Sequence, residues 1–266
     1  MSVPAGDIGE RRIGVVTGAS SGIGRSLALA LAARGDLVVA IGRDPGRLEA
    51  LRADLAGAGD APHRVLSLDV ADERDMGQLR ATLEGLGRVD LLIASAAVGR
   101  GPGLPPPTAA LGLEAWQAMV DVNLHGVFLA NMAVLPMMQA AGNGDIVNIA
   151  SSTTPRGLRG TALAPGYAAT KFALAEFGRQ LAAEMAPEGV RVRTIFPGPV
   201  ETPLIADTLL DGPFGGRISD TNFASALLGL LDLGHDMAVS EPHVLPVPRR
   251  RGRAGAAGRR QEVSDG

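Results

Sequence analysis

Short runs of apolar, often β-branched residues alternate with longer alanine- and leucine-rich segments along most of this chain. The apolar runs predict buried strands at 13–17, 37–41, 65–68, 91–94, 146–149 and 191–196. The segments between them have helical periodicity at 23–33, 45–56, 72–86, 114–140 and 167–185. Because parallel strands need crossover connections and a parallel sheet needs cover on both faces, this alternation predicts an α/β fold with a doubly wound parallel sheet.

The chain of 266 residues shows no long linker or internal repeat, so we expect a single domain over residues 1–248. Hydrophobic residues make up 46% of the chain, which is enough to fill a sizeable core. Residues 249–266 contain six arginines and almost no apolar residue beyond alanine. They predict a disordered, solvated tail, with contact to nucleic acid or anionic lipid as the alternative.

The net charge of −3 gives no overall electrostatic reason to expect nucleic acid or a membrane as a partner, so we expect small molecules and copies of the chain. The absence of cysteine excludes disulfides and thiolate metal sites and fits a reducing compartment. The N-terminal segment lacks the apolar region of a signal peptide, and no uninterrupted apolar run reaches about 18 residues. We therefore expect a cytoplasmic protein. No metal site is expected, because no metal-ligand spacing joins His63, His125, His235 and His243.

Residues 17–24, TGASSGIG, connect the first predicted strand to the first predicted helix. Glycine at 18, 22 and 24 allows a tight turn and a close approach of the backbone to a pyrophosphate, which then lies at the positive end of the helix. This context predicts a dinucleotide site. A nucleoside-triphosphate P-loop is disfavoured because that motif needs a lysine here, and the only lysine of the chain is Lys171.

The end of the second predicted strand carries the signal for the type of dinucleotide. An NAD site usually offers an acidic side chain to the ribose 2′-hydroxyl, whereas an NADP site offers arginine to the 2′-phosphate. Here Gly42 and Arg43 follow the strand, and Asp44 comes one position later. We favour NADP(H), with Arg43 as the phosphate ligand and Ser20 or Ser21 as helpers, while Asp44 keeps NAD(H) open as the alternative.

Tyr167 is the only tyrosine of the chain and stands four residues before Lys171. On a helix these two residues share one face. A cation about 5 Å from a phenol, at an effective dielectric of about 20, favours the phenolate by ~3 kcal/mol, so we expect Lys171 to lower the pKa of Tyr167. Tyr167 is then suited to general acid–base catalysis, giving a proton to a carbonyl oxygen in a reduction and accepting one in an oxidation.

Six motifs, in chain order, resemble those of the short-chain dehydrogenase/reductase family. They are TGASSGIG at 17–24, SLDV at 67–70, VNL at 122–124, IVNIASS at 146–152, YAATK at 167–171 and FPGPVET at 196–202. The resemblance covers about residues 10–248. It implies a Rossmann-type sheet of seven strands in the order 3-2-1-4-5-6-7, and hydride transfer between a nicotinamide cofactor and a ketone or secondary alcohol.

The resemblance also implies roles for single residues. Ser151 aligns with the serine that hydrogen-bonds the substrate oxygen, and Asn123 aligns with the asparagine that supports a water in the proton relay. Because the segment between Ser151 and Tyr167 is about three residues longer than usual, Ser152 is an alternative to Ser151. Lys171 is implied to hold the nicotinamide ribose. The implied cofactor contacts are Gly18, Ser20, Ser21, Gly22, Ile23, Gly24, Arg43, Asp69, Val70, Ala96, Tyr167, Lys171, Pro197, Gly198, Val200 and Thr202.

Two departures from the family pattern bear on the fold. The family commonly has Asn-Asn-Ala-Gly after the fourth strand, where this chain has Ala-Ser-Ala-Ala at 94–97, so the asparagine side-chain bonds that bear on cofactor affinity and local sheet order are absent here. Pro246 and Pro248 lie in the last predicted strand, and an edge strand tolerates them where a central one would not.

The substrate is only weakly indicated. The segment 203–220 matches the variable lid of the family, and an apolar lid favours an apolar ketone or alcohol, unless these side chains only pack the lid onto the body. Its apolar residues include Leu204, Ile205, Leu209, Leu210 and Phe214. The alternatives are an NAD-dependent alcohol dehydrogenase and, outside enzymes, a non-catalytic nucleotide sensor or scaffold. We expect a homodimer or homotetramer packed through the helices around 114–140 and 167–186.

Overall fold

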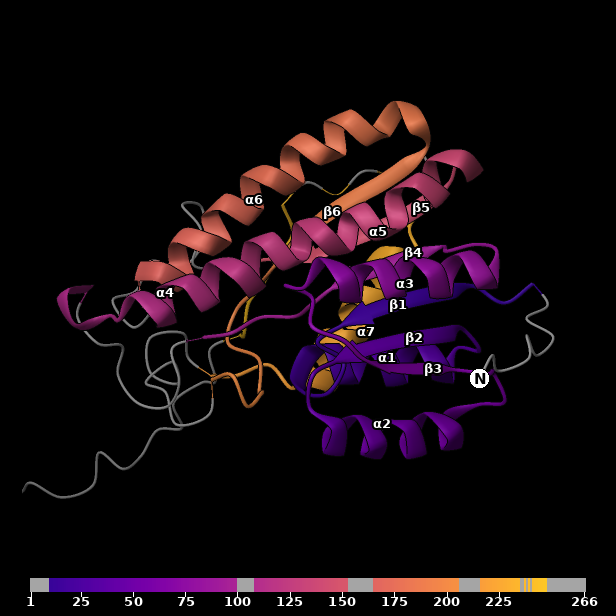
Figure 1. The fold of residues 1–266 in the computed structure, drawn as a ribbon, viewed down its shortest axis with the longest axis horizontal. Helices are drawn as coiled ribbons and strands as arrows, with labels where there is room; N and C mark the ends of the chain where they lie inside the picture. The colour runs from indigo at the N-terminus through magenta and orange to yellow at the C-terminus, as the bar shows by residue number, and fades with distance from the viewer. Residues whose placement is uncertain are drawn as a thin grey trace, which may run out of the picture.

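Seven strands in the described part of the chain form one parallel sheet (Figure 1). This computed structural model describes residues 10–99, 108–152, 165–205, 216–234, 237, 239 and 241–247. The strands are β1 Ile13–Thr17, β2 Leu37–Gly42, β3 Arg64–Ser67, β4 Leu91–Ala94, β5 Gly144–Ile149, β6 Val190–Pro197 and β7 His243–Val244. Their order is β3-β2-β1-β4-β5-β6-β7, and each neighbouring pair is parallel. The predicted α/β class, doubly wound sheet and strand order are confirmed.

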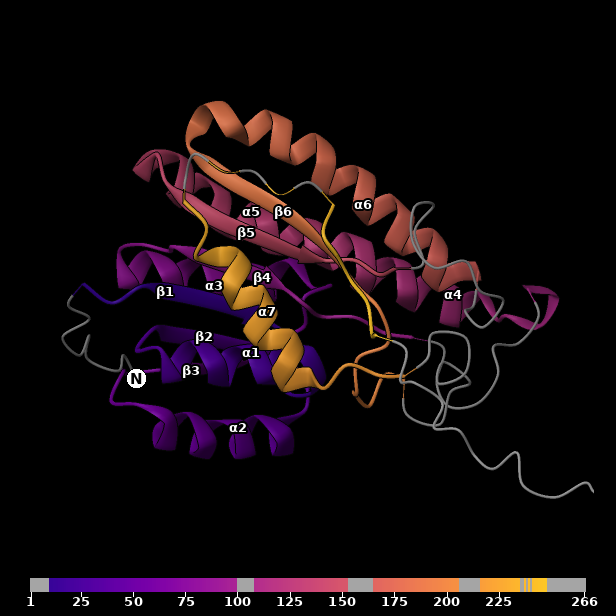
Figure 2. The same ribbon diagram turned by 180° about the vertical axis from the view of Figure 1, so that it is seen from behind.

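Helices cover both faces of the sheet. One face is covered by α1 Gly22–Ala33, α2 Pro45–Ala58 and α7 Asp220–Leu231 (Figure 2). The other face is covered by α3 Glu73–Leu86, α5 Gly126–Ala141 and α6 Pro165–Met185 (Figure 1). Two short 3-10 turns are η1 Thr108–Ala110 and η3 Ala186–Glu188. Each helical layer forms its own apolar core against the sheet.

The central strands are buried along their whole length because helices lie on both sides of them. Every residue of β1, β2, β4 and β5 is buried. A strand buried on both faces is a continuous apolar run in the sequence rather than an alternating one. The predicted bounds of β1 and β4 match the observed ones, β2 ends one residue later and β3 begins one residue earlier than predicted, and β5 begins two residues earlier, because Gly144 and Asp145 are not part of its apolar run.

The helix predicted over 114–140 is interrupted by a π turn. It consists of α4 Leu113–Val120, the π segment η2 Asp121–His125 and α5. Among the described helices, the stretch Leu113–Ala141 is the one long and apolar enough to cross a membrane. More than half of its most apolar window is buried inside the protein, so packing in the core accounts for much of its apolar character.

Between β6 and β7 the chain forms a helix, α7, that was not predicted from the sequence. Helix α7 begins after Ser219, whose side chain caps its first turn. This cap and the spacing of buried Phe223 and Leu227 are a signal visible in the sequence. Strand β7 is a two-residue edge strand beside β6, a position that tolerates prolines; it ends before Pro246, and Pro248 lies outside the described residues. The predicted tail at 249–266 and residues 206–215 of the predicted lid lie outside the described residues.

A network of charged groups closes the amino edge of the sheet. The buried carboxylate of Asp145, in β5, accepts two hydrogen bonds of 2.9 Å from Arg191 and one of 2.7 Å from Arg193, both in β6. Arg12, directly before β1, adds a fourth bond at 3.2 Å. Hydrogen bonds to charged groups, held away from water, tie these strands together at their amino ends.

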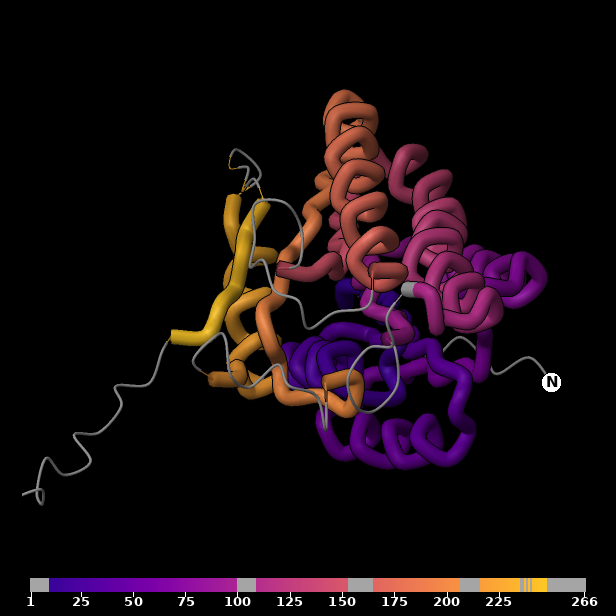
Figure 3. The backbone as a smooth tube through the Cα atoms, turned by 90° about the vertical axis from the view of Figure 1, so that its left-hand side faces the viewer, coloured from indigo at the N-terminus to yellow at the C-terminus, as the bar shows by residue number. Residues whose placement is uncertain are grey.

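The carboxyl edge of the sheet, which faces the viewer in Figure 3, is built differently. Helices α1 and α6 begin there, and the loops that follow β1, β4, β5 and β6 gather there. The strand order reverses between β1 and β4. In open α/β sheets, ligands bind at this switch point, outside the carboxyl ends of the strands.

Candidate active site

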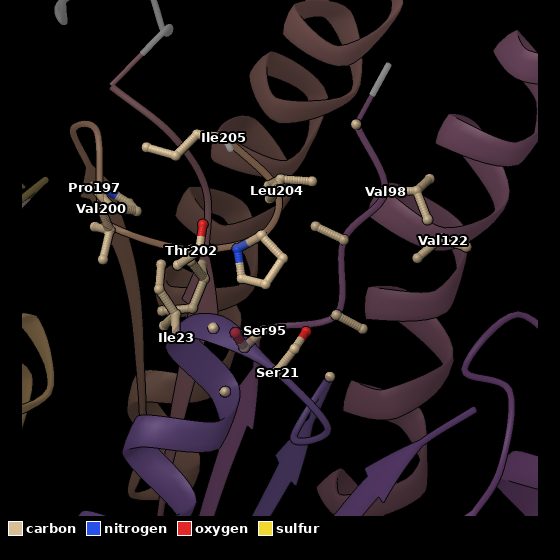
Figure 4. Close-up of a pocket in the computed structure, with 18 of the residues that line it drawn as sticks. Ser21, Ile23, Ser95, Val98, Val122, Pro197, Val200, Thr202, Leu204 and Ile205 are labelled. Atoms are coloured by element: carbon tan, nitrogen blue, oxygen red, sulfur yellow. The ribbon is translucent and has the colours of Figure 1, made fainter. Parts of the chain in front are cut away.

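A pocket of about 380 Å³ opens at the carboxyl edge of the sheet. Residues at or just after the ends of strands form its wall, among them Gly18 after β1. Figure 4 labels two others, Ser95 after β4 and Pro197 at the end of β6. The predicted site residues that line it are Gly18, Ser20, Ser21, Gly22, Ile23, Gly24, Arg43, Val70, Ala96, Ser151, Tyr167, Lys171, Pro197, Gly198, Val200 and Thr202. Two predicted residues, Asp69 and Asn123, are not part of the wall.

The turn between β1 and α1 leaves space for an anion bound by backbone groups. Gly18 and Gly22 have φ angles of +66° and +52°, a region that favours glycine. A Cβ on Gly24 would lie 2.4 Å from the carbonyl oxygen of Gly18, so a side chain does not fit there. The Ser21 side chain makes no capping bond, and the first turn of α1 has no acidic residue. Open backbone N–H groups at the positive end of a helix fit the pyrophosphate of a dinucleotide.

Two arginine–aspartate pairs follow β2. The guanidinium of Arg43 lies 3.3 Å from the carboxylate of Asp69, which also accepts a hydrogen bond from the backbone of Ala71. The carboxylate of Asp44 accepts a 3.0 Å hydrogen bond from the backbone N–H of Arg47 and thereby caps α2. It also lies 3.3 Å from the side chain of Arg47. Asp69 therefore acts on the pocket through Arg43 rather than as a wall residue.

The departure from the family pattern at 94–97 leaves the sheet intact. Ala94 pairs with Thr17 of β1 and also with β5. Beyond the strand, the hydroxyl oxygen of Thr17 accepts hydrogen bonds from the backbone N–H groups of Ser95 and Ala96, each at 3.1 Å. Thr17 thus fixes the first two residues after β4.

Tyr167, Ser151 and Lys171 meet at the pocket from α6 and from the end of β5. The side chain of Ser151 is hydrogen-bonded to the Tyr167 hydroxyl. The alternative serine, Ser152, has its backbone N–H bonded to β6. Lys171 is buried, and its Nζ donates a 2.7 Å hydrogen bond to the backbone carbonyl of Ile149. The same Nζ lies 5.9 Å from the centre of the Tyr167 ring. Of the two candidate serines, Ser151 is therefore the one whose side chain bonds to Tyr167.

Burial is the main cause of the pKa shifts of Tyr167 and Lys171. It raises the pKa of Tyr167 to about 12, although the hydrogen bond with Ser151 works in the opposite direction. Burial also lowers the pKa of Lys171 to about 7. The prediction that Lys171 lowers the pKa of Tyr167 is therefore wrong for this structure. It assumed a fully charged ammonium, whereas an amine with this pKa is about half neutral at pH 7, and here it is bonded to Ile149.

Asn123 lies in the π segment, and its side chain is fully buried. The amide accepts a 2.8 Å hydrogen bond from the backbone N–H of Val98 and donates one of 3.0 Å to its carbonyl. It also donates to the hydroxyl of Thr170 at 3.2 Å, and that hydroxyl donates to the backbone carbonyl of Tyr167 at 2.8 Å. Asn123 thus joins the loop after β4 to the first turn of α6.

Apolar groups close the outer part of the pocket. Leu204 points across it toward Val98 (Figure 4). A Cβ on Gly99 would lie 3.0 Å from Cδ1 of Leu204, and a Cβ on Gly22 would lie 3.0 Å from the side chain of Thr202. The segment after β6 therefore reaches both the glycine turn and the loop after β4.

Comparison with known proteins shows which family this chain belongs to. Residues 12–211 match the short chain dehydrogenase family. This chain belongs to the short-chain dehydrogenases. An uncharacterized oxidoreductase of Staphylococcus saprophyticus is 36% identical over 237 residues, which are 89% of this chain and 97% of that protein.

Solved structures of short-chain dehydrogenases have the same fold. An alcohol dehydrogenase from the archaeon Thermococcus sibiricus, complexed with 5-hydroxy-NADP, has a TM-score of 0.79 at 28% identity and covers 91% of this chain and 99% of its own. A 3-ketoacyl-(acyl-carrier-protein) reductase from Brucella melitensis, complexed with NADH, has a TM-score of 0.78 at 27% identity and covers 88% and 96%. As a short-chain dehydrogenase, this chain is an oxidoreductase that acts on alcohol or carbonyl groups with a nicotinamide cofactor. One of these two structures holds an NADP derivative and the other holds NADH.

Several residues of this short-chain dehydrogenase lie in or beside the pocket and were not predicted from the sequence. Arg47 lines the pocket from the first turn of α2, four residues after Arg43, and a second arginine so close to the end of the second predicted strand is a signal that could have found it. Thr170 lies inside the tyrosine–lysine motif, where its hydroxyl is visible in the sequence. Val98 and Gly99 give no such signal, because their place depends on the path of the loop after β4.

Proposed function

We propose that this chain is a ketoreductase that transfers hydride between NADP(H) and a ketone or secondary alcohol. The observation that carries the proposal is the hydrogen bond between Ser151 and Tyr167, beside buried Lys171, in the pocket that also contains the glycine turn. A proton donor and a dinucleotide cradle in one pocket meet the geometric needs of hydride exchange at a carbonyl group.

The proposed mechanism assigns proton transfer to the protein. A bound nicotinamide supplies or accepts the hydride. Tyr167, whose pKa is raised to about 12, keeps its proton at neutral pH and donates it to the carbonyl oxygen of the substrate. Ser151 orients the same oxygen by hydrogen bonding, and Lys171 holds the nicotinamide ribose. In the oxidative direction Tyr167 accepts the substrate proton only after it has lost its own.

The choice of NADP(H) is supported by the end of β2. Arg43 lines the pocket, and Ser20 lies against Gly42, where a Cβ would be 3.0 Å from that of Ser20. Asp44 is used as the cap of α2, which supports a site without an acidic ligand for the ribose hydroxyl. NAD(H) remains the alternative, because Arg43 and Arg47 each pair with an aspartate and so bring little net positive charge.

The proposed substrate is apolar around its carbonyl group. Leu204, Ile205, Val98 and Val122 line the pocket, and Figure 4 shows Leu204 and Ile205 on one side of it and Val98 and Val122 on the other. Apolar walls with a few convergent polar groups are typical of small-molecule sites. We also propose that the enzyme acts in the cytoplasm, consistent with its lack of cysteine.

The experiment is to mix the protein with NADPH or NADH and a panel of ketones, and to follow the absorbance of the reduced nicotinamide. We expect turnover of apolar ketones, faster at low cofactor concentration with NADPH than with NADH. Equal rates with both cofactors would contradict the NADP(H) assignment. Tight cofactor binding without turnover of any ketone or alcohol would instead support the non-catalytic sensor.

A further inference from the structure

The end of β2 and the first turn of α2 bring two guanidinium groups to the pocket. Arg43 follows β2, and Arg47 lies in the first turn of α2. Both residues line the pocket, together with Ser20, Gly42 and Asp44. Both side chains are more than half exposed, so a ligand in the pocket can reach them.

The carboxylate of Asp44 is directed at the helix and not left free. One oxygen accepts the backbone N–H of Arg47 at 3.0 Å, and the other lies 3.3 Å from Nε of the same residue. This single contact holds the Arg47 side chain by its Nε. Within the ranges that the structure describes, the Arg47 side chain pairs with no carboxylate other than that of Asp44 and donates no hydrogen bond. A guanidinium offers five N–H donors, so most of its donors remain available.

The space beside these arginines is bounded tightly on the glycine-turn side. At Gly42, an added Cβ would lie 3.0 Å from Cβ of Ser20, 3.1 Å from its Oγ and 3.2 Å from the side chain of Leu48. The Ser20 hydroxyl is therefore held next to the end of β2, on the same stretch of pocket wall as the two arginines.

We propose that Arg47 is a second specificity-determining residue, which binds the 2′-phosphate of the cofactor together with Arg43. The inference rests on the proposed use of NADP(H). A phosphate takes planar guanidinium groups as bidentate partners, and the Nη groups of Arg47 can serve it while Nε stays on Asp44. Asp44, which caps α2 and pairs with Nε of Arg47, is thereby engaged with the helix and unavailable as a ribose ligand.

Affinities of the full-length protein for NADPH and NADH test this inference, measured by the fluorescence of the reduced nicotinamide. In Arg47→Gln, NADPH should bind about tenfold more weakly, the loss expected for a hydrogen bond to a charged group, while NADH binding changes less than about twofold. The matched control is Arg52→Gln. Arg52 lies on the same helix, is similarly exposed and pairs with Glu49 three residues earlier, as Arg47 pairs with Asp44. It does not line the pocket, so both affinities should stay unchanged.

A second variant, Asp44→Asn, keeps an N-cap residue of equal quality and removes the negative charge beside Arg47. It should bind NADPH more tightly than the wild type does, without loss of stability. Retained NADH binding shows that each variant is folded.

The outcomes separate two failures. If wild-type protein binds NADPH no better than NADH, the proposed use of NADP(H) fails, and the inference on Arg47 fails with it. If the wild type prefers NADPH but Arg47→Gln keeps that preference in full, the inference on Arg47 alone is wrong.

Discussion

The hydroxyl of Tyr167 and the amino group of Lys171 lie in one buried part of the pocket, and burial moves their pKa values in opposite directions. The sequence predicts that these two residues share a helix face, because spacing along a helix is a local property. It does not predict the direction of the pKa change, because the desolvation of each group depends on the sheet and loops around it. The roles proposed for the two residues therefore start from a neutral phenol and a lysine that is only partly charged.

Lys171 should make stability depend on pH. Its pKa is about 7 in the folded protein and about 10.5 in the unfolded chain, so the unfolded chain binds more protons between these values. The free energy of unfolding should therefore rise with pH from about 7 to 9.5, by up to about 1.4 kcal/mol per pH unit from this group. Denaturant titrations across this range measure the slope.

The control for this slope is Lys171→Met, which fills the same space without a titrating group. The variant should lose the contribution of Lys171, so its unfolding free energy should rise less steeply than that of the wild type. Tyr167 does not interfere, since its folded pKa of about 12 lies above its unfolded value of about 10 and lowers stability only above about pH 10. If the unfolding free energy rises with pH equally steeply in both proteins, the pKa of Lys171 is not lowered in the folded protein.

Among the elements, the π segment and the first turn of α6 are joined by the hydrogen bonds of Asn123 and Thr170. The helical pattern predicts α6 within two residues at its start. The interruption of the long helix at Asp121–His125 has no comparable local signal, because it accompanies the bonds of Asn123 to Val98 and Thr170. The unpredicted part of the site is thus the part made by contacts between elements.

The Thr170 hydroxyl should matter for the position of Tyr167. Thr170→Val keeps the shape but leaves one N–H of the Asn123 amide unpaired, which should cost about 1–3 kcal/mol of unfolding free energy. A displaced first turn of α6 should lower kcat by about tenfold or more, with the NADPH affinity little changed. Thr170→Ser, which restores the hydroxyl, should recover most of both. Equal behaviour of the valine and serine variants in unfolding and steady-state assays would rule out this positioning role.

The molecule as a whole uses the two edges of its sheet differently. Charged groups around Asp145 tie the strands at the amino edge, and the pocket occupies the carboxyl edge. The fold could be predicted because both faces of the sheet are buried and the strands are therefore continuous apolar runs.

Within the described residues, helices α5 and α6 also expose large apolar side chains, Phe128, Met132 and Phe172. We propose that a second copy covers them.

Light scattering tests the proposed oligomer. The chain has a mass of 27.2 kDa, and we expect particles of two or four chains. Replacing Phe128 and Met132 together by serine should shift the mass toward one chain, because burial of these side chains drives the association. Leu245→Ser removes a similarly exposed apolar group beyond β7 and should leave at least a dimer. A wild-type particle mass of about one chain, measured at micromolar protein concentration, would contradict the proposed oligomer.

The most direct measurement is the rate of ketone reduction by Tyr167→Phe beside the wild type, with NADPH binding measured on both. Removing the hydroxyl removes the proposed proton donor, so kcat should fall by about 10²–10⁴-fold while the NADPH affinity changes little. Unchanged turnover in a variant that still binds NADPH would contradict the account, because a group other than Tyr167 would then deliver the proton.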